Sequence, residues 1–213
     1  MSGTEIDTTP VEEAGGPALP DAEARLFVAL DLPDRVLDEI VVWQTAQLRH
    51  LGDDGRGLRA VPAASLHVTL AFLGRRPKAD VPMITETLQD IAQGPVEGSL
   101  GAEPVPVPRG RPRLLALEVE SAAAIGLQAT LAARLAALGV YRPDRRPFWP
   151  HLTVFRVKGR AGWQHLGEGA GGLGSIPARS GHAFGFVRVA LYLSNLRPEG
   201  ASYARLAANE LPQ

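Results

Sequence analysis

Two short stretches of the chain carry the same phrase. The first is Ser65-Leu66-His67-Val68-Thr69-Leu70-Ala71-Phe72-Leu73-Gly74, and the second is Phe148-Trp149-Pro150-His151-Leu152-Thr153-Val154-Phe155-Arg156-Val157. Each contains His-x-Thr followed by an aliphatic residue inside an apolar run, which is typical of a buried strand. Because alternate side chains of a strand share a face, His67 should point the same way as Thr69, and His151 the same way as Thr153. The two stretches therefore predict two strands that each present an imidazole and a hydroxyl on one face.

The elements that precede these two strands also repeat. In the first half, the apolar and capping patterns predict a strand, a helix and the motif strand at 25–30, 33–51 and 65–73. In the second half, the same order is expected at 113–119, 121–139 and 150–157, with Ser121 as the N-cap of the helix. A strand–helix–strand unit that ends in His-x-Thr thus occurs twice, which indicates an internal duplication.

The remaining segments complete an α+β pattern. We expect a helix at 80–93, an edge strand near 97–105 in a proline-rich region, a strand at 184–195 with a weak point at Gly185, and a last strand at 203–207. Strands paired around helices without a regular βαβα series favour α+β over a doubly wound fold. Residues 1–24 are predicted to be a disordered tail, residues 25–212 a single bilobal domain, and 159–175 a mobile loop.

Composition narrows the function classes. The chain has 213 residues, a net charge of −1 and no cysteine. The absence of cysteine excludes disulfides and thiolate catalysis and fits a reducing compartment, so we expect the protein in the cytoplasm. A balanced charge gives no global basic field, so any contact with nucleic acid should be local. No apolar run approaches the length of a membrane span, and no membrane association is expected.

The two histidines suit acid–base chemistry at a phosphate. Cleavage of a phosphodiester needs one group to take a proton from the nucleophile and another to protonate the leaving oxygen, from opposite sides of phosphorus. Histidine suits both roles because its pKa near 6.5 leaves both forms available around neutrality. We therefore expect His67 and His151 to be catalytic, with Thr69 and Thr153 donating their hydroxyls to phosphate oxygens.

Basic residues around the motifs are further candidates for phosphate binding. Arg156 could clamp two phosphate oxygens, although strict alternation would send it to the other face of its strand, so a bend or a long reach is needed. The first motif has Phe72 at the same place, so the two halves are not chemically equivalent. Six further basic residues could together border the cleft and attract an RNA end, although each taken singly is interpreted as a solvated surface charge: Arg75, Arg76, Lys78, Arg142, Arg145 and Arg146.

Other chemistries find no support in the sequence. There is no H-E-x-x-H, no cysteine, and no carboxylate at ligand spacing from either motif histidine, so no metal site and no cofactor are expected. No P-loop or Gly-x-Ser-x-Gly pattern occurs. His50, His165 and His182 have no motif around them and are interpreted as structural or surface residues.

The residues just described resemble the 2H phosphoesterase superfamily, which has two His-x-Thr/Ser motifs. The resemblance is most specific to the RNA 2′,3′-cyclic phosphodiesterase family of bacteria and archaea, also called 2′-5′ RNA ligases, and spans about residues 25–212. It rests on four segments: Arg25-Leu26-Phe27-Val28-Ala29-Leu30-Asp31-Leu32-Pro33, Leu66 to Gly74, Arg146 to Arg156, and Ser194-Asn195-Leu196-Arg197-Pro198-Glu199-Gly200 with Tyr203. The chain differs from the usual pattern around Arg59-Ala60-Val61 and near Ala116, where the family often has aromatic residues.

The resemblance implies a bilobal, duplicated fold with two antiparallel sheets that face a central cleft and with helices outside. It implies hydrolysis of a 2′,3′-cyclic phosphate on RNA to a 2′-phosphate, with His67 as proton donor to O3′ and His151 as proton acceptor from water. The expected partners are RNA ends or small cyclic-phosphate nucleotides, and no protein partner is implied, so a monomer is expected. Two alternatives remain open at this point: 2′-5′ ligation by the same groups, and a non-catalytic module that binds RNA ends or nucleotides.

Overall fold

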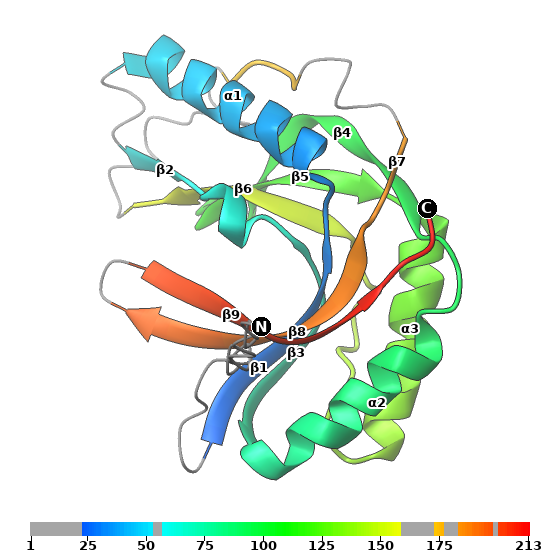
Figure 1. The fold of residues 1–213 in the computed structure, drawn as a ribbon. Helices are drawn as coiled ribbons and strands as arrows, with labels where there is room; N and C mark the ends of the chain where they lie inside the picture. The colour runs from blue at the N-terminus through cyan, green and yellow to red at the C-terminus, as the bar shows by residue number, and fades with distance from the viewer. Residues whose placement is uncertain (1–22, 53–56, 159–172, 177–182, 198–199) are drawn as a thin grey trace, which may run out of the picture.

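The computed structural model describes residues 23–52, 57–158, 173–176, 183–197 and 200–213 (Figure 1). The predicted tail lies outside these residues except for Glu23 and Ala24, which belong to the first strand. The predicted mobile loop also lies outside them up to residue 172, as do His165 and His182. No helix among the described residues is long and apolar enough to cross a membrane.

The described elements follow the predicted order closely. The first part of the chain forms β1 (Glu23–Asp31), α1 (Asp34–Leu51), β2 (Leu58–Ala60), β3 (Val68–Pro77) and α2 (Val81–Ile91). The second part forms β4 (Glu97–Val107), β5 (Leu114–Glu120), α3 (Ala122–Ala137), β6 (His151–Val157), β7 (Phe184–Gly185), β8 (Arg188–Arg197) and β9 (Gly200–Glu210). Short 3-10 turns at Ala63–Ser65 and Lys78–Asp80 precede β3 and α2. The α+β class predicted from the sequence is confirmed.

All strand pairs in the described part of the chain are antiparallel, and they form one curled sheet in the order β7-β4-β5-β6-β3-β1-β8-β9, with β2 paired to β6 (Figure 1). We call β3, β1, β8 and β9 the His67 half, and β2, β6, β5, β4 and β7 the His151 half. The register joins the two halves at one residue pair, Val68 with Leu152. The two sheets expected from the resemblance are therefore the two halves of a single hydrogen-bonded path.

The two halves have matching strand orders. The motif strands β3 and β6 meet at the centre, and each is flanked by the strand that opens its own strand–helix–strand unit, β1 or β5. Beyond these lie β8 in one half and β4 in the other. This arrangement places the two His-x-Thr phrases next to each other at the centre of the sheet, as an internal duplication predicts.

Helix α1 covers the His151 half, although it follows β1 of the other half (Figure 1). Its Trp43 ring packs 5.6 Å from the ring of Phe155 in β6. The buried amide of Gln44 donates hydrogen bonds to the carbonyl oxygens of Val61 and Val154, at 3.2 and 2.5 Å. Because an unpaired buried amide would be costly, these bonds fix α1 on the back of β6.

Helices α2 and α3 pack against each other (Figure 1). Helix α2 packs on β8 and β9, and the side-chain amide of Asn209 in β9 donates to carbonyl oxygens at the end of that helix. Helix α3 packs against α2 and contacts both β4 of its own half and β3 of the His67 half. Each half is therefore covered partly by a helix whose preceding strand belongs to the other half.

Local sequence signals explain most element ends. The Ser121 hydroxyl accepts a hydrogen bond from the Ala124 N–H at 3.0 Å, so the predicted N-cap of α3 is confirmed. Gly139, at φ +70°, follows the end of α3 in the left-handed region that glycine adopts without strain. The weak point at Gly185 is where the predicted strand divides, because Phe184 and Gly185 pair with β4 whereas β8 pairs with β1.

Candidate active site

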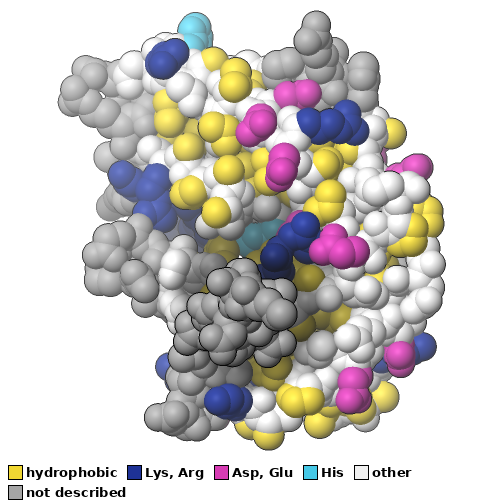
Figure 2. Space-filling view, viewed as in Figure 1, with side chains coloured by type: hydrophobic (Ala, Val, Ile, Leu, Met, Phe, Trp, Pro, Cys, Tyr) yellow, Lys and Arg dark blue, Asp and Glu magenta, His cyan; other side chains and the backbone are white. Residues whose placement is uncertain are grey.

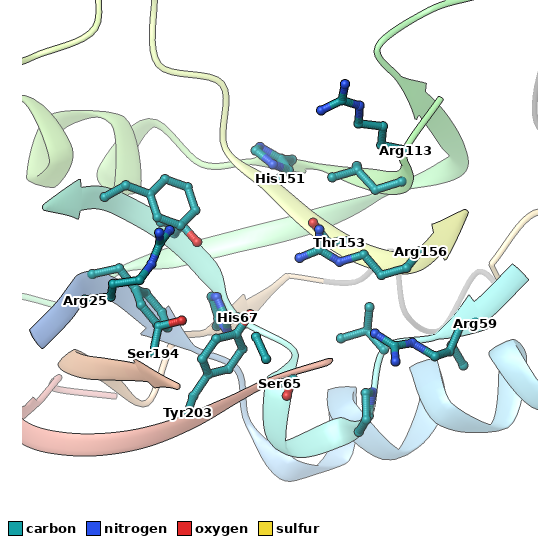
Figure 3. A pocket seen from close by; sticks show the side chains of 18 of the residues that line it. Arg25, Arg59, Ser65, His67, Arg113, His151, Thr153, Arg156, Ser194 and Tyr203 are labelled. Carbon is teal, nitrogen blue, oxygen red and sulfur yellow. The ribbon is translucent and has the colours of Figure 1, made fainter. Parts of the chain in front are cut away.

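A cleft of about 820 Å³ lies between the two halves, and both contribute side chains to it (Figures 2 and 3). All five residues predicted for the site line it: His67, Thr69, His151, Thr153 and Arg156. Figure 2 shows a histidine side chain in the hollow, with lysine or arginine side chains beside it. The structure therefore brings all five proposed groups into one cavity.

A β-bulge follows the threonine of the first motif. Thr69 pairs with Ala29 of β1, whereas Ala71 pairs with the adjacent Val28, so Leu70 is an extra residue in β3. A bulge of this kind changes which side chains face which side of a strand. After the bulge, Phe72 faces the cleft and is 72% exposed.

The second motif has the same bulge at the same place. The residues on either side of Val154 pair with consecutive residues of β5, so Val154 is the extra residue. Val154 and Phe155 are both fully buried, and Arg156 returns to the face that carries His151 and Thr153. Strict alternation alone would have turned Arg156 away from the cleft, and the bulge supplies the bend that its predicted place near the phosphate requires.

His67 is partly buried among aromatic rings. Its ring centroid lies 4.9 Å from that of Phe27, 5.3 Å from that of Tyr203 and 6.1 Å from that of Tyr192. Burial lowers the pKa of His67 to about 4, and the nearby charges of Arg156 and His151 act in the same direction, while a backbone hydrogen bond at Ser65 opposes them. His67 is therefore neutral at pH 7 in the free site.

His151 is oriented by the residue two positions before it. Its Nδ1 lies 2.9 Å from the carbonyl oxygen of Trp149, and its ring stacks on the Trp149 ring at 4.5 Å and 15°. Because a carbonyl oxygen can only accept, Nδ1 must carry the proton, which leaves Nε2 with a free lone pair in the neutral ring. The ring is thus oriented with its unprotonated nitrogen free, as a general base requires.

A polar group lies behind the aromatic cluster of His67. The Tyr192 hydroxyl donates to the largely buried carboxylate of Asp31, at 2.7 Å from each oxygen. Burial raises the pKa of Asp31, while the Tyr192 hydrogen bond and the charges of Arg188 and Arg205 oppose that rise. Sequence reasoning missed this group, because Asp31 and Tyr192 are 161 positions apart in the chain and only the fold brings them together.

The positive charge of the cleft does not come from the residues that the sequence suggested. None of the six basic residues expected at its border lines the cleft, so that prediction is wrong. Two of them have nearby carboxylate partners, since Arg76 pairs with Asp80 at 2.7 Å and Arg146 with Asp144 at 2.9 Å. The basic residues that do line it are Arg25, Arg59, Arg113, Arg156 and Lys158.

Neither a cluster of metal ligands nor a third histidine is found in the described part of the cleft. Within the described ranges, no group of three histidine, aspartate or glutamate side chains is placed to hold a metal ion. His50 lies exposed in the last turn of α1 and is absent from the lining of the cleft, in line with its interpretation as a surface residue.

Known proteins with similar sequences are phosphoesterases, which agrees with a cleft that holds two histidines. A family model described as LigT-like phosphoesterase matches residues 30–101. An RNA 2′,3′-cyclic phosphodiesterase of Methanothermobacter thermautotrophicus is 31% identical over 185 residues, which cover 85% of this chain and 95% of the relative. This chain belongs to the LigT-like phosphoesterase family. Another family member, an RNA 2′,3′-cyclic phosphodiesterase of Archaeoglobus fulgidus, is 34% identical over 63% of this chain and 73% of its own length.

Solved structures of LigT-like phosphoesterases share the fold. The crystal structure of TT0787 of Thermus thermophilus superposes with a TM-score of 0.71 at 28% identity, over 88% of this chain and 97% of that chain. Apo LigT of Escherichia coli superposes with a TM-score of 0.68 at 23% identity, over 90% of this chain and 99% of that chain. The bilobal fold implied by the sequence resemblance is therefore the fold of this family.

Proposed function

We propose that this protein hydrolyses the 2′,3′-cyclic phosphate at an RNA end to a 2′-phosphate, as the names of its relatives indicate for those proteins. The observation that carries the proposal is the meeting of two imidazoles in one cleft, one directly before β3 and one at the start of β6, each with a threonine two residues on that also lines the cleft. A 2′,3′-cyclic phosphate can form only on ribose, so the substrate class is RNA or a ribonucleotide.

The reaction divides between the two histidines. Nε2 of His151 takes a proton from water as the water oxygen forms a bond to phosphorus. The bond between phosphorus and O3′ breaks in line with this attack, and His67 donates a proton to O3′. One water molecule is consumed, and the two histidines exchange protonation states before the next turnover. Each acid–base group supplies roughly 10²–10⁴ in rate.

The low pKa of His67 makes substrate binding part of this mechanism. In the free site, burial and the charges of Arg156 and His151 keep His67 neutral. A cyclic phosphate brings a negative charge between these groups, which favours the charged form of His67 and raises its pKa. The proton donor is therefore charged most readily when the phosphate is present.

Thr69, Thr153 and Arg156 are the proposed phosphate ligands. The two hydroxyls lie beside the histidines on the cleft face, and each can donate one hydrogen bond to a non-bridging oxygen. Arg156 lies near enough for its charge to lower the pKa of His67, so its guanidinium is in range of the same phosphate. Charge-assisted bonds from a guanidinium stabilise the charge that accumulates on the phosphate oxygens during attack.

Both histidines come from one chain, so a monomer supplies the complete site, and we propose that the protein acts as a monomer. The cytoplasmic location stays a prediction that rests on the cysteine-free composition. Light scattering of the purified chain tests the first statement, and fractionation of the source cells tests the second.

The test is a product assay on an RNA oligonucleotide that ends in a 2′,3′-cyclic phosphate, carried out with EDTA present. The wild type should release a 2′-phosphate, identified by phosphorus NMR. His67→Ala and His151→Ala should each lower kcat by roughly 10²–10⁴-fold. His50→Ala is the matched control, because that imidazole is exposed on α1, and its kcat should equal that of the wild type.

Circular dichroism separates loss of chemistry from loss of fold in the two alanine variants. Full activity in either folded variant would overturn the assignment of that histidine. Tight binding of the cyclic end with no turnover by the wild type would favour a binding module instead. A 3′-phosphate product would reverse the assignment of the leaving oxygen.

A further inference from the structure

Four basic side chains gather on the His151 half of the cleft, and we call them the cationic wall: Arg59, Arg113, Arg156 and Lys158. Arg59 in β2 lies directly opposite Arg156 in the register of β2 and β6. Arg113 precedes β5, and its carbonyl accepts from the Val157 N–H at 2.9 Å, while the Lys158 N–H donates to Gly57 at 2.7 Å. Backbone bonds therefore hold the cationic wall along three neighbouring strands.

Three members of the cationic wall, Arg113, Arg156 and Lys158, have little compensating negative charge in the cleft lining. No aspartate or glutamate is among the described residues that line the cleft. Within the described part of the chain, Arg113, Arg156 and Lys158 form no ion pair. In a chain of net charge −1, this concentration of cations points to an anionic ligand.

The charge of the cationic wall exceeds what one cyclic phosphate requires. That phosphate carries one negative charge and already has two threonines and Arg156 as proposed ligands. Figure 3 shows Arg59 and Arg113 on the same side of the cleft as Arg156, away from Arg25. The opposite half presents Phe72 and Tyr203 to the cleft, which are suited to a nucleoside rather than to a phosphate.

We propose that Arg59, Arg113 and Lys158 bind a second phosphate of the substrate, the one attached to O5′ of the nucleotide that carries the cyclic phosphate. In RNA this is the phosphodiester that joins the last nucleotide to the rest of the strand. This inference rests on the proposed function and names its substrate class: RNA ends are preferred over free nucleoside cyclic phosphates, because only RNA ends carry this second phosphate.

The test compares three substrates that differ at O5′: adenosine 2′,3′-cyclic phosphate, the same compound with a 5′-phosphate, and a diadenosine with a 2′,3′-cyclic end. A charge-assisted hydrogen bond stabilises by about 1.5–3 kcal/mol, which corresponds to roughly tenfold or more in kcat/KM. The wild type should therefore favour the two substrates with a phosphate at O5′ by at least about tenfold. Arg113→Gln/Lys158→Gln should reduce that preference by about tenfold.

The matched control is Arg142→Gln/Arg145→Gln, which removes two exposed cations that do not line the cleft. It should keep the preference of the wild type. The salt dependence gives a second readout, because each phosphate contact on a single strand contributes about 0.7 to the slope of log affinity against log salt. The cleft variant should lose about that much of the slope with the diadenosine substrate.

Equal preference in the cleft variant and the wild type would overturn the inference. A gain seen with the diadenosine but absent with the 5′-phosphorylated nucleotide would also overturn it, since the contact would then be to the second nucleoside. Failure of the proposed function would give a different result, because the wild type would then hydrolyse none of the three substrates. In that case calorimetric binding of adenosine 2′-phosphate with and without a 5′-phosphate still decides the inference.

Discussion

The two halves of this sheet have the same backbone plan and different side chains around it. In each half the motif strand presents a histidine and a threonine, forms a bulge one residue later and pairs with the first strand of its unit. Each histidine also forms a hydrogen bond to the backbone of the residue two positions before it. The equivalent positions around these features differ, since Phe72 corresponds to Arg156 and Phe27 to Leu114.

Because the side chains of the two halves differ, the two imidazoles have different surroundings. His67 lies in an aromatic cluster that disfavours its charged form, whereas His151 is stacked on Trp149 in the half that carries the cationic wall. A symmetric backbone can therefore place two equal groups around one phosphate, while the surrounding side chains make them unequal as acid and base. Substitutions that make the halves more alike test this interpretation.

The largest effect is expected from exchanging the residues that follow the bulges. Arg156→Phe should lower kcat/KM by about 10²–10³-fold, because it removes the donors that stabilise charge on the phosphate. Phe72→Arg/Arg156→Phe should recover about tenfold of this loss, since the bulge in β3 places position 72 on the cleft face as well. Steady-state kinetics on a cyclic-phosphate oligonucleotide gives both values. An Arg156→Phe variant as active as the wild type would remove Arg156 from the site.

The next effect concerns pH and stability. The pKa of His67 is about 4 in the folded protein and near 6.5 in the unfolded chain. The unfolded state therefore binds a proton between these values that the folded state does not, so the free energy of unfolding falls as the pH drops from about 6.5 to 4. The full difference is on the order of 3 kcal/mol and persists below pH 4.

Urea unfolding of the wild type and His67→Gln between pH 7 and pH 4 measures this contribution, because all other titrating groups are shared. The wild type should lose stability relative to the variant as the pH falls. Parallel curves would show that His67 does not have a depressed pKa.

The smallest effect is expected from the aromatic cluster. Phe27→Leu gives β1 the residue that β5 has at the equivalent position and removes ring contacts with His67, Tyr192 and Tyr203. It should lower the free energy of unfolding by about 1–2 kcal/mol, since such ring pairs contribute roughly 0.5–1.5 kcal/mol beyond their burial. Urea unfolding at pH 7 measures the change. A loss below about 0.5 kcal/mol would mean that these rings contribute no more than their burial.

The order of the helices and strands, and the residues that meet in the cleft, could be predicted because they depend on interactions between residues close together in the chain. Apolar runs and caps such as Ser121 depend on near neighbours in the chain, so they can be recognised before the fold is known. The His-x-Thr phrases were recognisable for the same reason, because alternation within a strand fixes how one side chain lies relative to the next but one.

The orientation of Arg156 and the source of the cationic wall could not be predicted in this way. Leu70 and Val154 are ordinary aliphatic residues, and nothing in the sequence distinguishes a bulged one from a paired one. The basic residues that do line the cleft come from separate segments that strand pairing brings together, which the sequence does not show; of the six expected ones, Arg76 and Arg146 pair with nearby carboxylates instead.

The crossing of the helices has a consequence for how the molecule could be divided. Helix α1 leaves the His67 half to cover β6, and α3 bridges the two halves, because it packs against α2 and β3 as well as against β4 of its own half. A chain cut between the two repeats, near Gly110, would yield two fragments. Each fragment would expose an apolar surface that a helix of the other fragment covers in the intact protein. The repeated unit is therefore not an autonomous folding unit, and co-expression of both fragments should be needed to recover soluble, active protein. The two halves therefore depend on each other for a complete hydrophobic core.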